Sequence, residues 1–484
     1  MADGEGKTKL APSRRRWLDL AITLVLMFGI GALPPFGTVT PYGMQILGIL
    51  VGVIYAWIRG EIIWSSVIAF VVMGLCGSNT VAGVVSGAFG NGSVIQVICA
   101  LLFCYAIQST GLLDVIASWI LSRKFARKSL WSLAFAFFLA ATVGAMILGG
   151  GFPVVILLWT VFYDVCDQMC IKPYEKYPTL VMIGIGICAD SGSIVMPYNP
   201  WLAICNGMFS SVSGGLTFNM GLYVAFMLIL NVAILFAVTF VFWLIGRNID
   251  YSEICVPMRE AKLTKRDKRM ALYLVIALAL LVLPGVLPGG NPVFDVLRKI
   301  GLSGMFLLVP VFYMMVTYEG ENLYDIGKAL KEGVAWDTVV LIACALTLGS
   351  ALTSKDTGIA AWLGSTVSSL LAGQSIATVM IIMIAAVVVL TNAINNGVVA
   401  TIMLPLGVTI ITAMGGNPIL FAMFVVVLSL QGIVMPSGSI VGALLHGNSK
   451  WLKPSMIYKY TIIGELAVLA VSIICIPLGN MLIG

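Results

Sequence analysis

The amino-acid sequence predicts an all-α polytopic membrane protein, with about 11 transmembrane helices and two re-entrant helical hairpins in two inverted-topology repeats. Three observations lead to this fold class. The 484 residues are 60% hydrophobic and only 10% charged, whereas soluble domains carry roughly 25% charged residues. The apolar runs are long and continuous, which excludes the short alternating strands of a transmembrane barrel. Two stretches of the chain also share one pattern of interruptions.

The long apolar segments divide into spans and hairpins. A helix needs about 20 apolar residues to cross a bilayer. Two segments, 131–164 and 374–413, are interrupted midway by GGGFP and NAINNG, and we interpret each as a hairpin that enters and leaves on one side. The remaining segments are the predicted spans, approximately 17–33, 41–58, 62–77, 93–110, 179–209, 219–246, 270–287, 302–317, 335–353, 418–446 and 456–481.

The distribution of basic residues supports this topology. If the N-terminus is cytoplasmic and the spans alternate, 24 of the 27 Lys and Arg residues (27 − 3) lie on the cytoplasmic side, and only Arg298, Lys299 and Lys355 lie outside. That agrees with the positive-inside rule. A hairpin that crossed the membrane would move every later loop to the opposite side. The sequence therefore predicts a multi-pass protein of the cell membrane, with a cytoplasmic N-terminus and an external C-terminus.

An internal repeat runs through the chain. The pentapeptide SGSIV occurs at 191–195 and again at 437–441, 246 residues later (437 − 191). Upstream, LGGGFPVV at Leu148 parallels AINNGVVA at Ala393, and the segments from Asn91 and Trp336 match at a similar offset. The two hairpins open to opposite sides in the predicted topology, so the repeats are inverted. Inverted repeats with paired helix breaks are typical of secondary transporters, whose binding sites lie where the breaks meet.

The small polar residues of SGSIV favour a binding site over simple helix packing. Backbone left unpaired in hydrocarbon costs several kcal/mol per group, so an unwound stretch persists only where it lines a cavity or binds something. Freed carbonyls can coordinate a cation, and helix N-termini attract an anion. Small residues also mark close helix packing, but two copies at matched positions indicate two half-sites.

The repeats define the predicted domain organisation, in which the repeats form the moving transport unit and the other spans the scaffold. The units are a cytoplasmic tail (1–16), scaffold helices (17–90), the first inverted repeat with its arm, hairpin 131–164 and broken helix 179–209 (91–209), scaffold helices with a basic linker at 247–269 (210–335), the second inverted repeat with its arm, hairpin 374–413 and broken helix 418–446 (336–452), and a last scaffold helix (453–484).

These motifs resemble the divalent anion:sodium symporter family of the ion transporter superfamily, over nearly the whole chain. Asn395-Asn396-Gly397 stands where this family has a Ser-Asn-Thr hairpin tip, and the segment 435–439 resembles its M/L-P-x-[AG]-T break. The first repeat departs from the pattern, with Gly150-Gly151-Phe152 at the tip and 196–200 in place of G-T-P-P-N. A literal Ser-Asn-Thr at 78–80 lies outside both hairpins, and we interpret it as coincidence.

The resemblance implies two sodium sites, one in each repeat. Ligands for the second site would be Thr391, Ile394, Asn396 and Gly438, and ligands for the first would be Gly150, Gly151, Asp190, Ser191 and Gly192.

It also implies the residues that contact substrate. Phe152 is bulkier than the threonine of the family and lacks its hydroxyl. A typical C4-dicarboxylate is therefore not the expected substrate, and a larger or partly aromatic anion becomes an alternative. The implied substrate-binding residues are Gly151, Phe152, Ser191, Ser193, Asn395, Asn396, Gly397, Pro436, Ser437, Gly438 and Ser439.

Three ionisable residues lie in or near predicted spans. Carboxylates at membrane depth are costly and usually functional. Asp190, next to the first SGSIV, has two readings: a cation ligand or proton-coupling group, or a charge that is only capped by helix N-terminal amides. Glu465 has equally balanced structural and functional readings. His446 has two interpretations: a pH-sensing or substrate-contacting residue, or, favoured, a solvent-accessible polar residue near the cytoplasmic end.

The sequence as a whole predicts a secondary active transporter, not an enzyme. It would import a small organic anion, similar to a di- or tricarboxylate, coupled to sodium by an elevator-type alternating-access mechanism. The expected partners are the anion, sodium, membrane lipid and a second copy of the chain; no cofactor and no nucleic acid are expected. A cation-independent anion exchanger and a sodium/proton antiporter remain as alternatives. A serine hydrolase is disfavoured, because His446 lies seven residues beyond Ser439 (446 − 439), about two helical turns away.

Overall fold

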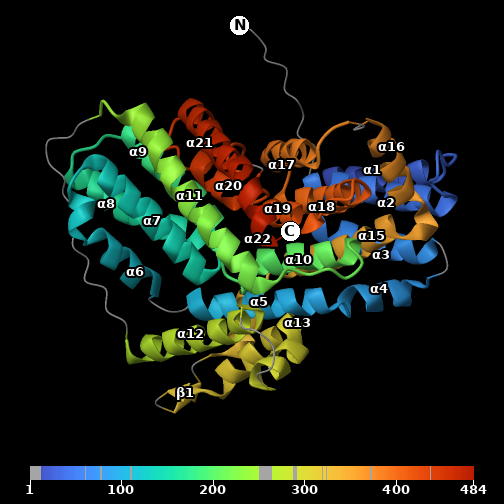
Figure 1. The fold of residues 1–484 in the computed structure, drawn as a ribbon, viewed down its shortest axis with the longest axis horizontal. Coiled ribbons are helices and arrows are strands. Elements are labelled where there is room, and N and C mark those ends of the chain that lie inside the picture. The colour runs from blue at the N-terminus through green and yellow to red at the C-terminus, as the bar shows by residue number, and fades with distance from the viewer. Residues whose placement is uncertain are drawn as a thin grey trace, which may run out of the picture.

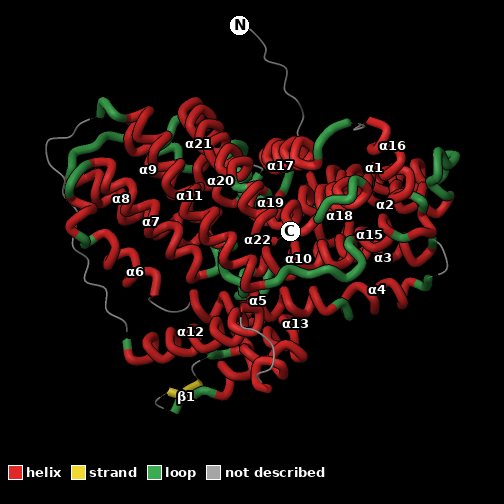
Figure 2. Tube along the Cα trace, in the orientation of Figure 1, coloured by secondary structure: helices red, strands yellow, loops and turns green. Residues whose placement is uncertain are grey.

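The computed structural model describes residues 12–59, 61–76, 79–108, 112–249, 264–286, 292–318, 320–322, 324–370, 373–436 and 438–483. Within these residues the regular structure is helical, apart from one pair of two-residue strands (Figure 2). The predicted all-α architecture is therefore confirmed.

Up to residue 246, the described part of the chain forms eleven α-helices. Their bounds are α1 Pro12–Gly31, α2 Pro41–Ile58, α3 Ile62–Leu75, α4 Val81–Phe89, α5 Gly92–Gln108, α6 Leu112–Leu121, α7 Leu130–Leu148, α8 Gly151–Gln168, α9 Lys176–Ser193, α10 Pro200–Val212 and α11 Met220–Gly246, with a 3-10 helix at Lys124–Arg127.

The second half continues in the same style after the linker. Its elements are α12 Lys265–Val286, α13 Pro292–Met315, β1 Thr317–Tyr318, β2 Glu321–Asn322, α14 Ile326–Glu332, α15 Trp336–Thr353, a 3-10 helix at Lys355–Thr357, α16 Ile359–Leu370, α17 Ile376–Ala393, α18 Asn396–Ala413, α19 Pro418–Leu428, α20 Ile440–Gly447, α21 Pro454–Ile474 and α22 Ile476–Ile483.

Eight of the described helices are long and apolar enough to cross a membrane, or nine if the α4–α5 pair, bent by 45°, counts as one span. The helix α4 was not predicted. Thr80 caps its N-terminus by accepting a hydrogen bond from the Gly83 N–H at 3.1 Å. That contact gives the threonine of the Ser-Asn-Thr at 78–80 a structural role. The predicted total of about 11 spans stays a prediction.

Each interrupted apolar segment forms a helical hairpin, as predicted. The pair α7–α8 turns at Gly149, whose φ of +64° is accessible to glycine at little cost. The pair α17–α18 turns at Ile394 and Asn395. In Figure 1 the first hairpin lies at the left end of the molecule, and the second lies to the right, near α1, α2 and α15. The predicted arms are α6 and α16.

The two broken helices differ from the prediction in where they unwind. The sequence places both breaks at SGSIV, but α9 continues to Ser193, so the first break spans 194–199 and residues 191–193 are helical. Ser191 Oγ donates to the Ile187 carbonyl at 2.9 Å, and Ser193 Oγ donates to the Asp190 carbonyl at 2.8 Å. These bonds satisfy the hydroxyls within the helix itself. The second break is longer and spans 429–439, in which the described residues 429–436, 438 and 439 are non-helical; Ser437 lies outside the described residues.

Packing brings the two repeats together around the breaks. The short helix α19 packs against α10, α18 and α17, and α9 packs against α7, α8 and α21. The helices α11 and α21 pack against each other and against α9. Both were predicted to be scaffold, although they contact a helix of the predicted transport unit; the division into scaffold and transport unit stays a prediction.

Candidate functional site

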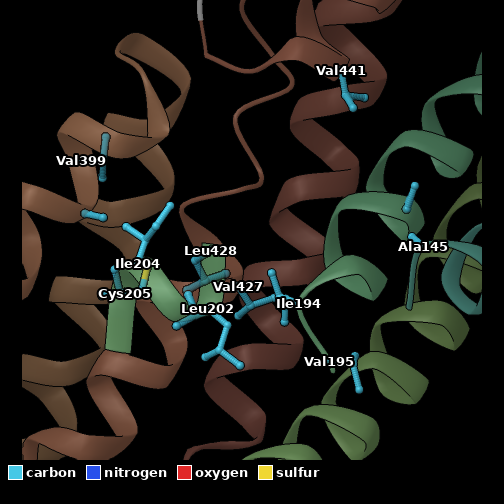
Figure 3. Close-up of a cluster of buried hydrophobic side chains, with 14 of the residues drawn as sticks. Ala145, Ile194, Val195, Leu202, Ile204, Cys205, Val399, Val427, Leu428 and Val441 are labelled. Atoms are coloured by element: carbon cyan, nitrogen blue, oxygen red, sulfur yellow. The ribbon is translucent and has the colours of Figure 1, made fainter. Parts of the chain in front are cut away.

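The two breaks lie side by side in the centre of the protein. Trp201, in the first turn of α10, donates its indole N–H to the Val426 carbonyl at 3.1 Å and lies 3.2 Å from Ser429 Oγ. Figure 3 shows Ile194 of the first break in one buried apolar cluster with Val427 and Leu428 at the end of α19. The chain therefore places both breaks at one junction, as the repeat predicts.

The second break closes on the tip of its hairpin through a cluster of oxygen atoms. One terminal atom of the Asn396 amide lies 2.8 Å from the Gly438 carbonyl oxygen and 2.9 Å from the Ser429 carbonyl oxygen. The same atom lies 2.9 Å from Thr391 Oγ1, and this hydroxyl also donates to the Ser429 carbonyl. Thr391 is fully buried. Three of the four ligands implied for the second sodium site, Thr391, Asn396 and Gly438, are thus in one place.

The Asn396 amide can present either of its ends to this cluster. With the NH2 group inward, it donates to the two carbonyls. With Oδ1 inward, this oxygen lies within 2.9 Å of two carbonyl oxygens and the Thr391 hydroxyl oxygen, and a cation among the four oxygens would offset their repulsion. Unwound carbonyls and side-chain oxygens are the ligands that sodium uses in broken-helix transporters. The residues present therefore fit a sodium ion by their donor chemistry.

Two glycines allow the cluster to form. A Cβ on Gly432 would lie 2.5 Å from the Thr391 carbonyl oxygen and 3.1 Å from Asn396 Oδ1. A Cβ on Gly438 would lie 2.5 Å from the Gly432 carbonyl oxygen and 2.8 Å from that of Thr391. Backbone atoms cannot give way as a flexible side chain does. Any larger residue at either position would therefore push the cluster apart.

A buried carboxylate holds the unwound segment in place. Glu465, in the middle of α21, is 4% exposed. Its Oε1 accepts the Ile433 N–H at 3.1 Å, and its Oε2 accepts from Asn392 Nδ2 at 2.5 Å. Asn392 Oδ1 in turn accepts the Val434 N–H at 2.8 Å. Glu465 therefore takes a position beside the oxygen cluster, because Asn392 follows Thr391 and Ile433 follows Gly432 in the chain.

The sequence left the role of Glu465 open and assigned none to Asn392. The only sequence signal was the presence of a carboxylate within an apolar span. His446 lies at the edge of the same network, with Nε2 2.8 Å from the Val434 carbonyl oxygen and its ring 4.9 Å from that of Tyr458, centroid to centroid. It is half-buried, so part of the side chain is accessible to solvent.

The first repeat closes its own break with side chains from residues 198 and 199. Asn199 Nδ2 donates to the Gly149 carbonyl at 3.1 Å and to the Ser193 carbonyl at 2.8 Å. The Tyr198 hydroxyl lies 2.6 Å from the Met146 carbonyl oxygen. The hairpin tip and the break are thus joined directly, without an intervening group. The sequence assigned no role to Tyr198 or Asn199.

Asp190 lies against the start of α8. A Cβ on Gly151 would lie 2.6 Å from Asp190 Oδ1, so the carboxylate is next to the first residue of that helix. Asp190 is 8% exposed, and among the described residues its Oδ2 has no hydrogen-bond partner. The positive end of the α8 dipole faces the carboxylate. Its Oδ2 stays free among the described residues, and both interpretations of Asp190, cap and coupling group, stay predictions.

The remaining predicted residues serve the backbone around the junction. Asn395 Oδ1 accepts the Gly397 N–H, Ser439 Oγ accepts the Gly442 N–H, and the Ile394 N–H donates to Leu390. Phe152 is 39% exposed at the start of α8, and Pro436 is exposed in the second break. Gly150 precedes α8, and a Cβ on Gly192 would lie 2.5 Å from the Thr142 carbonyl oxygen of α7. Gly192 therefore serves close helix packing.

The described apolar helices and the paired breaks define a multi-pass membrane transporter. A family model described as "Citrate transporter" (CitMHS) matches residues 13–426. The chain therefore belongs to the CitMHS citrate transporter family, and it is a secondary transporter of carboxylate anions and not an enzyme. This membership confirms the resemblance to the divalent anion:sodium symporter type.

A solved structure supports the fold. The YdaH transporter of Alcanivorax borkumensis aligns with a TM-score of 0.54 at 16% sequence identity, over 82% of this chain and 86% of that chain. Comparison with curated protein sequences gave no match.

Proposed function

We propose that this protein imports a di- or tricarboxylate anion, with citrate the first candidate, together with sodium, by an elevator-type alternating-access mechanism. The oxygen cluster formed by Asn396, Thr391, Ser429 and Gly438 is the observation that carries the proposal. It combines the ligand type of a sodium site with a position at the junction of two helix breaks.

The anion would bind beside this cluster through helix N-termini. The helix α18 begins at Asn396 and α20 begins directly after Ser439, so two N-termini converge where Asn396 meets Gly438. Each N-terminus carries about half a positive charge and unpaired N–H groups. Neither described break contains Lys or Arg, so a bound cation would supply the full positive charge that a carboxylate needs. Cation binding before anion binding would then prevent leak.

The test is uptake of radiolabelled citrate into proteoliposomes under an inward sodium gradient, with choline in place of sodium as the control. We expect uptake in sodium that is at least tenfold above uptake in choline, and we expect Asn396→Ala to reduce it to the choline level. The matched control is Asn417→Ala, because Asn417 caps α19 away from the cluster. Equal uptake in both salts would refute sodium coupling.

A cation-independent exchanger is the second candidate, because the inward NH2 orientation of Asn396 satisfies both carbonyls without an ion. An exchanger would take up labelled citrate only when the vesicles contain unlabelled anion, and it would do so equally in sodium and choline.

We also propose a homodimer in the cell membrane with a cytoplasmic N-terminus and an external C-terminus. The basic residues of the predicted cytoplasmic segments support this orientation. Accessibility of terminal tags to protease in sealed right-side-out vesicles would test the orientation, and chemical crosslinking in the membrane would test the dimer.

A further inference from the structure

We propose that the first repeat holds no coupling ion, because the amide of Asn199 permanently takes the place that a cation would have there. Each chain would then bind one sodium ion, at the second repeat. This inference rests on the proposed sodium coupling and specifies its stoichiometry. It replaces the expectation of two sodium sites.

The orientation of the Asn199 amide is fixed by a second bond. Asn199 is the N-cap of α10, and its Oδ1 accepts the Leu202 N–H at 3.0 Å. The NH2 group must therefore face the opposite way, toward the carbonyls of Gly149 and Ser193. Both hydrogens of the NH2 group are used. Asn199 is 3% exposed, so rotation would leave buried carbonyls and a buried N–H without partners, each at a cost of about 1–3 kcal/mol.

The single O–H of Tyr198 lies within hydrogen-bond reach of two neighbouring carbonyls. The last four carbonyls of a helix have no partner within the helix, and in α7 these are the natural ligands for an ion at the hairpin tip. The Tyr198 hydroxyl lies 2.6 Å from the Met146 oxygen and 2.7 Å from the Ile147 oxygen, and the Gly149 N–H donates to Ala145. Together with the Gly149 carbonyl bonded to Asn199, these contacts leave an ion few free oxygens at this tip.

The corresponding amide in the second repeat is not fixed in this way. At the start of α18 the capping bond is made by Asn395, whose Oδ1 accepts the Gly397 N–H at 2.9 Å. Among the described residues, no hydrogen bond holds the outer end of the Asn396 amide. The Asn396 amide can therefore rotate. It would point its oxygen toward the cluster when a cation binds, and its NH2 group toward the cluster when the cation leaves. In the second repeat Asn395 caps the helix and Asn396 is the ligand, so the Asn396 amide stays free to rotate.

Asp190 does not restore a cation site in the first repeat. It contacts the start of α8, an 18-residue helix, whose N-terminal dipole already provides a positive partner. The hydroxyls of Ser191, an implied ligand, and of Ser193 donate to carbonyls of α9, so both are turned toward their own helix.

The experiment is equilibrium binding of ²²Na⁺ to the purified full-length protein, with choline as the balancing salt. We expect saturation at about one ion per chain and a Hill coefficient of about one. We expect Asn199→Ala to retain this binding while melting at a lower temperature, and Asn396→Ala to lose it. Tyr198→Phe is a milder second variant for the first repeat, in case Asn199→Ala does not fold.

The outcomes separate this inference from the proposed function. Binding of two ions per chain, or loss of binding in Tyr198→Phe or Asn199→Ala with retention in Asn396→Ala, overturns the single-site inference and leaves sodium coupling intact. A wild-type protein that binds no sodium overturns both. One ion per chain that depends on Asn396 alone supports the inference.

Discussion

The two breaks carry the same pentapeptide and use it in opposite ways. In the first repeat, SGS is the last turn of α9, and Tyr198 and Asn199 tie the break that follows to the carbonyls of Met146 and Gly149 at the tip of the first hairpin. In the second repeat, the break precedes α20, Ser439 caps that helix, and carbonyls converge on Asn396. The comparison shows that the position of nearby donors, and not the SGSIV motif itself, decides whether a break offers free oxygens.

The largest effect is expected from Gly438→Ala. The new Cβ would lie 2.5 Å from the Gly432 carbonyl oxygen, so the second break would have to move away from Thr391. We expect sodium-dependent uptake to fall by about 100-fold or more, equivalent to about 2.8 kcal/mol. Gly447→Ala is the matched control, because its Cβ would meet nothing within 4 Å. Normal uptake by Gly438→Ala would show that the cluster is not the site.

A smaller effect is expected from Glu465→Gln. The amide has one acceptor oxygen where the carboxylate has two, so either the Ile433 N–H or the Asn392 amide loses its partner. Hydrogen bonds to charged groups contribute about 1.5–3 kcal/mol. We expect the sodium concentration for half-maximal uptake to rise about tenfold, with partial rescue by Glu465→Asp. An unchanged sodium dependence would assign Glu465 a purely structural role.

Asp190→Asn tests whether the first repeat takes part in sodium binding. The substitution replaces a buried carboxyl group whose Oδ2 has no partner among the described residues, and a buried carboxyl without hydrogen bonds is costly. We expect the melting temperature to rise by about 1–3 °C, with sodium stoichiometry unchanged. Loss of sodium binding, or an altered pH dependence of uptake, would instead make Asp190 a coupling residue.

The smallest expected effect is a difference in stability between serine-to-alanine variants of the two SGSIV copies. Ser439→Ala removes the N-cap of α20 and should lower the free energy of unfolding by about 1 kcal/mol, measured by thermal or denaturant unfolding in detergent. Ser191→Ala removes a hydroxyl that bonds only within its own helix and should change stability by less than about 0.5 kcal/mol. Equal effects from the two variants would remove the distinction between the breaks.

The sequence by itself determined the helical class, the two hairpins and the pairing of the breaks. Apolar runs, Gly and Asn interruptions and a repeated motif are local signals, and hydrocarbon forces every backbone group in such runs into a helix or a bound state. Thr391, Asn396 and Gly438 came from the resemblance of the second hairpin tip and break to the motifs of the divalent anion:sodium symporter family.

Tertiary structure alone decided in which break the carbonyl oxygens are already hydrogen-bonded to protein side chains. Whether α9 ends before or after Ser193 depends on partners that are distant in sequence: Gly149 for Asn199, and Met146 for Tyr198. Glu465 is likewise defined by Ile433 and Asn392, which lie on other elements. A hydrogen bond between segments far apart in the chain has no local pattern, so the sequence could present the carbonyls of both repeats but could not show which of them the fold had already satisfied.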